Sequence, residues 1–193
     1  MGKGNNQNRK SIRLKDYDYS SGGNYFVTIV SYQRKDSFGK IVDAEMNLNQ
    51  IGLIVEEVWN AIPSHYSYVS IDTYIIMPSH LHGILIINDT NVVGARHASP
   101  LRDVDSTQHK RQPLGIIIGS FKFAVTKRIH NLDLLSQEKI WQRGYYEHII
   151  RDERDYEKIY EYIEANPINW SLDEENMTSE RFLRPFAQLD RKD

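Results

Sequence analysis

The sequence contains no cysteine, which excludes disulfide bonds, thiolate metal sites and cysteine nucleophiles. It also lacks long hydrophobic runs: the unbroken apolar stretches are only a few residues long, far too short to span a membrane. Residues 1–15 are polar and basic and contain no apolar segment, so they do not resemble a signal peptide. We therefore expect a soluble cytoplasmic protein that does not contact a membrane.

A strong net charge is missing as well, since the 193 residues carry a formal charge of −2 at pH 7. With 40% hydrophobic and 26% charged residues, the composition is that of a globular protein, and the length suits one domain. Positive charge is nevertheless clustered: seven basic residues face two acidic ones between Arg96 and His130, and the N-terminal arm adds Arg9, Lys10, Arg13 and Lys15. Such clustering permits an anionic partner without requiring one.

Hydrophobic patterning predicts seven elements in the order strand, helix, strand, strand, helix, strand, helix. β-Branched and aromatic residues indicate strands at 24–32, 70–77, 81–88 and 139–150. The second and third strands are joined by a tight turn at Pro78-Ser79, and the fourth is bent at Gly144. Apolar residues at helical spacing, with caps and prolines, indicate helices at 50–62 (ended by Pro63), 114–131, and 152–166 (from Asp152 to Pro167).

The first six elements match the ferredoxin-like split βαβ arrangement, an α+β fold with an antiparallel sheet and two helices on one face. The seventh element is an extra C-terminal helix, which must lie at the sheet edge or on the open face. We divide the chain into a basic polar arm (1–22), one domain (23–170) containing a long mobile loop (89–113), and a polar tail (171–193).

Two histidines, His80 and His82, stand at the start of a predicted strand. Residues i and i+2 of a strand point to the same face, so the two imidazoles can converge on one metal ion. Zinc sites generally use three or more protein ligands, whereas an oxygen-rich remainder suits Mg²⁺ or Mn²⁺. Two ordinary hydrogen-bonded histidines would give the same pattern.

The predicted last helix carries a tyrosine away from its apolar side. Its core stripe is predicted to consist of Tyr156, Ile159, Tyr160 and Ile163. Tyr162 lies about 120° from the centre of that stripe, and Asn166 stands one turn further on the same flank. This flank suits a nucleophile beside a metal ligand. An exposed tyrosine and a helix-ending asparagine before a proline are the simpler interpretation.

Three sequence blocks occur in a fixed order: MPSHLHGILI at 77–86, WQRGYYEHIIRDERDY at 141–156 and YIEANP at 162–167. Together they resemble the single-tyrosine HUH transposases, and within that family the REP-associated tyrosine transposases. The resemblance covers roughly residues 24–167. A His-hydrophobic-His motif alone is weak evidence, but the ordered set of blocks is specific.

The resemblance implies a ferredoxin-like catalytic domain that uses a divalent metal, Mg²⁺ or Mn²⁺, and a nucleophilic tyrosine. His80 and His82 match the metal ligands, and Asn166 matches a third ligand that many relatives supply as glutamine. Tyr162 matches the nucleophile, with Tyr160 as the fallback. Glu147 and His148 match a block to which we assign no role. The implied partner is single-stranded DNA carrying hairpins, bound by a monomer or a homodimer.

The predicted activity is metal-dependent cleavage and strand transfer of DNA through a 5′-phosphotyrosine. For substrate contact we predict residues of the helix 114–131 that combine an aromatic ring with polar and basic groups, namely Ser120, Lys122, Phe123, Lys127 and Arg128. Three alternatives stay open: a domesticated DNA-binding protein of the same fold without cleavage activity, a hydrolase using metal-bound water, and a structural metal module.

Overall fold

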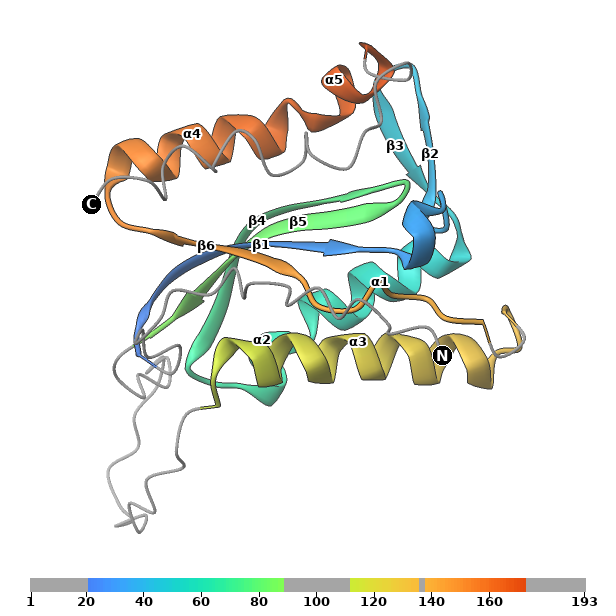
Figure 1. Cartoon of the computed structure of the whole chain (residues 1–193), viewed down its shortest axis with the longest axis horizontal. Helices are drawn as coiled ribbons and strands as arrows, with labels where there is room; N and C mark the ends of the chain where they lie inside the picture. Colours follow the sequence, from blue (N-terminus) through green and yellow to red (C-terminus); the bar gives the residue numbers. More distant parts are fainter. Residues whose placement is uncertain (1–20, 89–111, 136–137, 173–193) are drawn as a thin grey trace, which may run out of the picture.

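The computed structural model describes residues 21–88, 112–135 and 138–172 (Figure 1). Nearly all of the predicted N-terminal arm, of the predicted loop at 89–113 and of the predicted C-terminal tail lies outside the described residues. In these three ranges no helix combines the length and the hydropathy needed to cross a membrane.

A four-stranded antiparallel sheet forms the centre of the fold, with the strand order β4-β5-β1-β6. Its strands are β1 (Gly23–Val30), β4 (Val69–Met77), β5 (His80–Ile87) and β6 (Tyr146–Ile150). β1 pairs with both β5 and β6, and β4 forms a hairpin with β5 around the predicted Pro78-Ser79 turn. This order is the ferredoxin-like one, so the predicted α+β fold class is confirmed.

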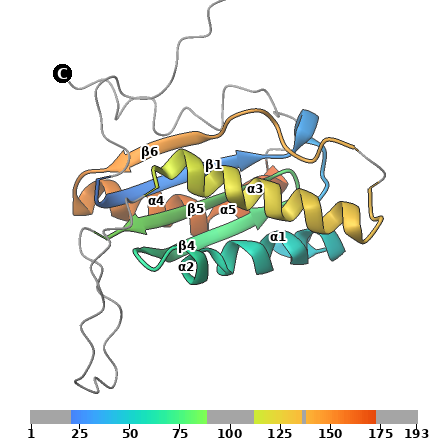
Figure 2. The same cartoon turned by 90° about the horizontal axis from the view of Figure 1, so that it is seen from below.

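Helices cover both faces of this sheet (Figures 1 and 2). One face carries α1 (Gln50–Asn60), the short α2 (Ile62–His65) and α3 (Leu114–Asn131). The opposite face carries α4 (Glu153–Glu164), followed by α5 (Asn166–Leu172). Of the two positions considered for the extra helix, the structure therefore shows the open face.

Side chains of β1 alternate between two separate cores because both faces of the strand are covered. Tyr25, Val27 and Ile29 pack in the core formed with α1 and α3. Phe26 packs in the smaller core formed with α4. The same alternation on β5 sends Leu81 and Leu85 to the first core and leaves the side chains of His80, His82 and Ile84 on the α4 side.

The predicted strand at 139–150 was too long. Only Tyr146–Ile150 is a strand, and Gly144 adopts a left-handed backbone with φ of 78°. The carbonyl groups of Gln142 and Gly144 accept hydrogen bonds from the ammonium of Lys122, at 2.8 and 2.6 Å. The segment before β6 is therefore not a continuous strand, although Trp141 still forms an isolated antiparallel bridge with Ser31.

Both prolines follow the end of a helix, as predicted, but each also begins a short helix that was not predicted. α1 ends at Asn60 and α4 ends at Glu164, in each case before the proline. Pro63 and Pro167 lie in the first turns of α2 and α5. A first-turn residue needs no backbone N–H for the helix, so proline is well suited to starting these short helices.

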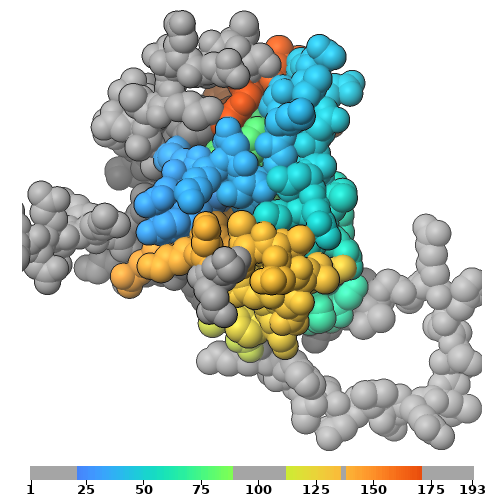
Figure 3. Space-filling view, turned by 90° about the vertical axis from the view of Figure 1, so that its right-hand side faces the viewer, coloured from blue at the N-terminus to red at the C-terminus, as the bar shows by residue number. Residues whose placement is uncertain are grey.

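A second hairpin, β2 (Gly39–Val42) with β3 (Glu45–Leu48), was not predicted. Its two-residue turn uses Asp43 and Ala44 with φ of 52° and 61°, positions where Asn-Gly or Asp-Gly is the usual signal. The hairpin lies beside α5 at one end of the molecule (Figure 3). Between β1 and this hairpin, the chain forms the short 3-10 helix η1 (Tyr32–Arg34).

Candidate active site

Two buried histidines at the start of β5 form the centre of the site. His80 is 1% exposed and His82 is fully buried, and both side chains lie on the face covered by α4 and α5. Their ring centroids are 4.5 Å apart with the rings at 71°. The i, i+2 spacing therefore brings the two imidazoles together, as the strand pattern predicted.

Burial keeps these two histidines neutral. It lowers the pKa of His82 from 6.5 to about 3. It also lowers the pKa of His80 well below its ordinary value, with further lowering by the charges of His82 and Arg34. A neutral imidazole has a lone pair on one ring nitrogen, and this is the form that ligates metals.

Hydroxyl groups hold the Nδ1 side of each ring. Thr28, directly opposite His82 on β1, places Oγ1 2.8 Å from Nδ1 of His82 in a buried hydrogen bond. Ser79 Oγ lies 3.3 Å from Nδ1 of His80. A partner at Nδ1 sets the orientation of the ring and leaves Nε2 for another interaction.

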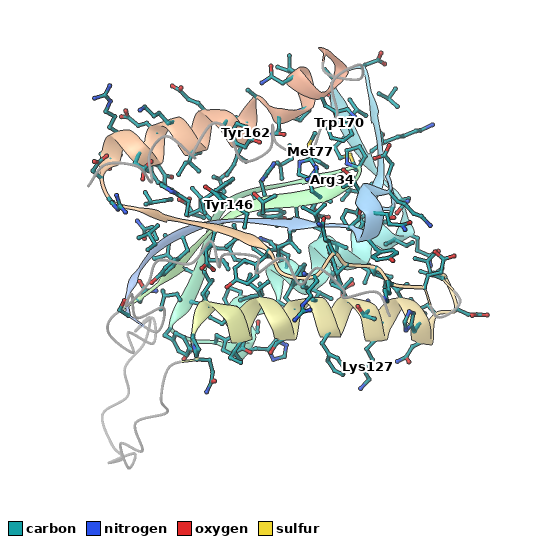
Figure 4. All side chains as sticks on the ribbon, in the orientation of Figure 1. Arg34, Met77, Lys127, Tyr146, Tyr162 and Trp170 are labelled. Carbon is teal, nitrogen blue, oxygen red and sulfur yellow. The ribbon has the colours of Figure 1, made fainter. Side chains whose placement is uncertain are left out.

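Tyr162 on α4 reaches the nitrogen that Thr28 leaves available. Its hydroxyl lies 3.4 Å from Nε2 of His82, and the two ring centroids are 5.2 Å apart (Figure 4). The tyrosine is half-buried, and its ring meets Phe26 edge-on at 6.2 Å. The predicted nucleophile therefore lies in direct contact with one of the predicted metal ligands, His82, within one chain.

The predicted core stripe of this helix was partly wrong. The buried residues of α4 are Asp155, Ile159 and Ile163, with Tyr162 packed against their core. Tyr160 is 42% exposed, and its ring stacks on that of Tyr156 at 6.2 Å. The buried side of the helix therefore includes Tyr162, which was predicted to lie away from the apolar side, and it leaves out Tyr160. The fallback nucleophile therefore lies on the outer side of α4.

Asn166, the predicted third metal ligand, is 7% exposed and begins α5. Its Nδ2 donates a 2.8 Å hydrogen bond to the carbonyl of Tyr162, which leaves the amide oxygen as its remaining polar atom. The described part of the chain contains no group of three or more His, Asp, Glu or Cys side chains that could hold a metal. Imidazole nitrogens and amide oxygens are nevertheless groups of the kinds that ligate divalent metal ions.

A further buried pair escaped the sequence interpretation. His148 Nε2 lies 2.8 Å from Oδ2 of Asp155, linking β6 to the first turn of α4 on the same face as His82. The backbone N–H of Asp155 also donates a 2.8 Å hydrogen bond to Oδ1 of the N-cap residue Asp152. Glu147, one residue earlier on β6, is directed to the opposite face, so the two members of the Glu-His block serve different layers.

The residues predicted to contact DNA lie on α3, on the far side of the sheet from the histidines (Figure 4). Lys122 is committed to the carbonyls of Gln142 and Gly144, and burial lowers its pKa to about 8. Arg128 pairs with Glu57 at 2.5 Å, and Ser120 accepts a hydrogen bond from the hydroxyl of Tyr66. Phe123 is 68% exposed and Lys127 points away from the sheet. The structure does not bring these residues to the histidine site.

No family model matches this chain. An uncharacterized protein of Haemophilus influenzae is 42% identical over 168 residues, which are 86% of this chain and 92% of that protein, so the two belong to one family. A second protein of that organism, described as "Putative REP-associated tyrosine transposase", is 27% identical over 151 residues, 78% of this chain and 73% of its own length. A solved REP-associated tyrosine transposase bound to a REP hairpin is 19% identical, covering 82% of this chain and 74% of its own, with a TM-score of 0.49.

Proposed function

We propose that this chain, a relative of the REP-associated tyrosine transposases, cleaves single-stranded DNA and transfers the cut strand through a covalent link to Tyr162. The observation that supports this proposal is the 3.4 Å approach of the Tyr162 hydroxyl to Nε2 of His82, beside the buried His80. A nucleophilic side chain in contact with metal-ligating groups is one arrangement that supports covalent phosphoryl transfer.

In the proposed reaction the Tyr162 oxygen attacks the phosphorus of one phosphodiester. A bond forms between phosphorus and the tyrosine oxygen, and the bond from phosphorus to the 3′ oxygen breaks. The 5′ side stays attached as a phosphotyrosine, and the proton lost by tyrosine is matched by the proton gained by the leaving 3′ oxygen. A second 3′-hydroxyl reverses the exchange and joins new ends without an external energy source.

We further propose that His80, His82 and the amide oxygen of Asn166 hold a divalent metal, Mg²⁺ or Mn²⁺. When bound, such an ion supplies Lewis-acid stabilisation of the phosphate oxygens. The protein itself contributes neutral imidazoles, the Thr28 hydroxyl that orients His82, and the bond from Asn166 to the Tyr162 carbonyl. These contacts position the nucleophile before the substrate arrives.

The same contacts bear on the active unit. Tyr162 and His82 meet within one chain, so we propose that a monomer contains a complete active site. The proposed substrate is single-stranded DNA carrying a hairpin, the class that the sequence blocks imply. Phe123 and Lys127 would then contact DNA on a separate surface of α3, behind the sheet.

The test is formation of a covalent protein–DNA adduct. Purified protein is mixed with an end-labelled library of single-stranded hairpins and Mn²⁺ or Mg²⁺, and the products are separated under denaturing conditions. We expect a protein-linked band with the wild type, and its loss in Tyr162→Phe and in His82→Ala. Tyr160→Phe is the matched control, because it removes the same hydroxyl from the outer side of the same helix.

Each of the other outcomes would indicate a different nucleophile or a different function for this protein. An adduct that persists in Tyr162→Phe and disappears in Tyr160→Phe would move the nucleophile to Tyr160. Cleavage without any adduct would indicate hydrolysis by metal-bound water. Hairpin binding without cleavage in either metal, and unaffected by Tyr162→Phe, would indicate the domesticated DNA-binding protein.

A further inference from the structure

Two side chains from outside the central sheet reach the His80 end of the site. Trp170 on α5 places its ring centroid 5.7 Å from that of His80, at 42°. Arg34, at the end of η1, is close enough for its charge to act on His80. Figure 4 shows Arg34 and Trp170 at the same end of the sheet, on either side of Met77. Neither residue belongs to the sequence blocks that carry the family resemblance.

The backbone that presents Arg34 is strained. Gln33 and Arg34 both have left-handed backbones, with φ of 56° and 55°. Such conformations cost non-glycine residues about 1 kcal/mol or more, and they persist where the surrounding structure holds them. Here the Arg34 N–H donates to the Ser31 carbonyl at 3.1 Å, and the Ser31 hydroxyl donates to the Lys35 carbonyl at 2.7 Å. A strained backbone that is held by two hydrogen bonds points to a functional role for the Arg34 side chain.

Arginine at this position suits an anion. Its planar guanidinium offers a fork of N–H donors that matches two oxygens of a phosphate. A phosphate that reached the histidines would therefore meet a cation on the η1 side.

Trp170 offers the complementary surface, a flat apolar ring. It is half-buried, and its helix packs beside the β2–β3 hairpin (Figure 3). Bases of single strands stack on such rings regardless of sequence, whereas the stacked bases of a duplex cannot. The ring and the guanidinium together match the two parts of one nucleotide.

We propose that Arg34 and Trp170 form a subsite for one unpaired nucleotide next to the reacting phosphate, with the guanidinium on a phosphate and the indole on the base. This inference rests on the proposed function for its substrate class, single-stranded DNA. It adds the residues that select an unpaired strand at the point of cleavage.

The subsite is tested by DNA binding in EDTA, without any cleavage. The probe is a labelled oligodeoxythymidine of about ten nucleotides, titrated at several salt concentrations. We expect Trp170→Ala to weaken binding about tenfold and Trp170→Phe to retain part of the stacking. Tryptophan fluorescence of the wild type should be quenched by the oligonucleotide, and this quenching should be lost in Trp170→Phe.

Arg34→Gly separates binding from folding. Glycine relieves the left-handed backbone, so thermal stability should be unchanged or higher, while affinity falls about tenfold and the salt dependence weakens by about one phosphate contact. Arg34→Lys should retain the salt dependence and lose part of the affinity. Lys35→Ala is the matched control, since it removes an exposed cation from the same loop that pairs with Glu138.

The outcomes distinguish this inference from the proposed function. Wild-type affinity in both Arg34→Gly and Trp170→Ala, or no oligonucleotide binding at all, overturns the subsite even if Tyr162 forms an adduct. Binding that depends on both residues in a protein that never forms an adduct supports the subsite and rejects the cleavage. An equal loss in Lys35→Ala would show a general charge effect and would also overturn the assignment to Arg34.

Discussion

The two faces of the sheet differ in what they bury. On the α1 and α3 side the interior consists of large apolar side chains packed against one another, with Trp59 at its centre. On the α4 side the apolar core is small: Phe26, Ile84, Tyr146, Ile150, Ile159 and Ile163. Around that small core lie the buried polar side chains Thr28, His80, His82, His148, Asp155 and Asn166.

This difference separates stability from chemistry. Burial of apolar area is the main stabilising contribution to folding, and the first face supplies most of it. Buried polar groups cost free energy unless they are hydrogen-bonded, and here four of them form the pairs Thr28–His82 and His148–Asp155. The α4 side therefore has less apolar packing than the α1 and α3 side, and it contains a set of polar atoms oriented by hydrogen bonds.

The largest effect should come from breaking the apolar face. Trp59 is fully buried, meets Phe121 edge-on at 5.3 Å, and packs so closely on Gly83 that a Cβ there would lie 2.7 Å from it. We expect Trp59→Ala to lower the free energy of unfolding by about 3–5 kcal/mol, measured by chemical denaturation. Tyr162→Phe, on the other face, should change it by about 1 kcal/mol or less. Equal losses in both variants would remove the distinction between the faces.

Much of this fold could be predicted from local patterns. The bounds of the helix 114–131, the hairpin around Pro78-Ser79 and the convergence of His80 with His82 all follow from periodicity within a single element. These features depend only on residues that are close in sequence.

The remaining features depend on contacts between elements. Thr28 faces His82 only because β1 and β5 pair in one register, and a shift of one residue would turn it away. Asp155 is buried and forms a hydrogen bond with His148 on β6. From polarity alone, Asp155 is predicted on the surface of the helix and Tyr160 in the core. The sequence predicts Lys122 as a solvent-exposed cation, but in the structure its ammonium donates hydrogen bonds to the carbonyls of Gln142 and Gly144. No periodicity within one segment contains this information.

The second largest effect should be a fall in the free energy of unfolding at acidic pH. Burial lowers the pKa of His82 to about 3 and that of His80 well below its usual range. Below pH 6.5 the unfolded chain binds protons at these histidines and the folded chain does not. The free energy of unfolding should therefore fall as the pH falls, by at most about 1.4 kcal/mol per pH unit for each histidine.

This acid sensitivity is measured by urea unfolding in EDTA between pH 7 and pH 4. His82→Gln cannot take up the proton, so its stability should depend less steeply on pH, by about one proton. Because both histidines lie on the α4 side, Trp59→Ala should keep the wild-type slope while its stability is lower throughout. A slope unchanged by His82→Gln would show that the imidazole is not held neutral by the fold.

The smallest effect on the free energy of unfolding should come from Thr28→Val, which should nevertheless weaken metal binding at the site. Thr28→Val keeps the shape of the side chain but removes the hydroxyl at Nδ1 of His82. Loss of a bond that orients a ligating histidine typically weakens metal binding by about 10–100-fold. We expect that loss in Mn²⁺ titrations followed by calorimetry. Thr126→Val is the matched control, since it removes a hydroxyl bonded to the Lys122 carbonyl within α3, behind the sheet. If both variants bind Mn²⁺ like the wild type, the Thr28 hydroxyl does not orient His82 for metal binding. The hydrogen bonds of the α4 side would then contribute to packing and not to the proposed metal site.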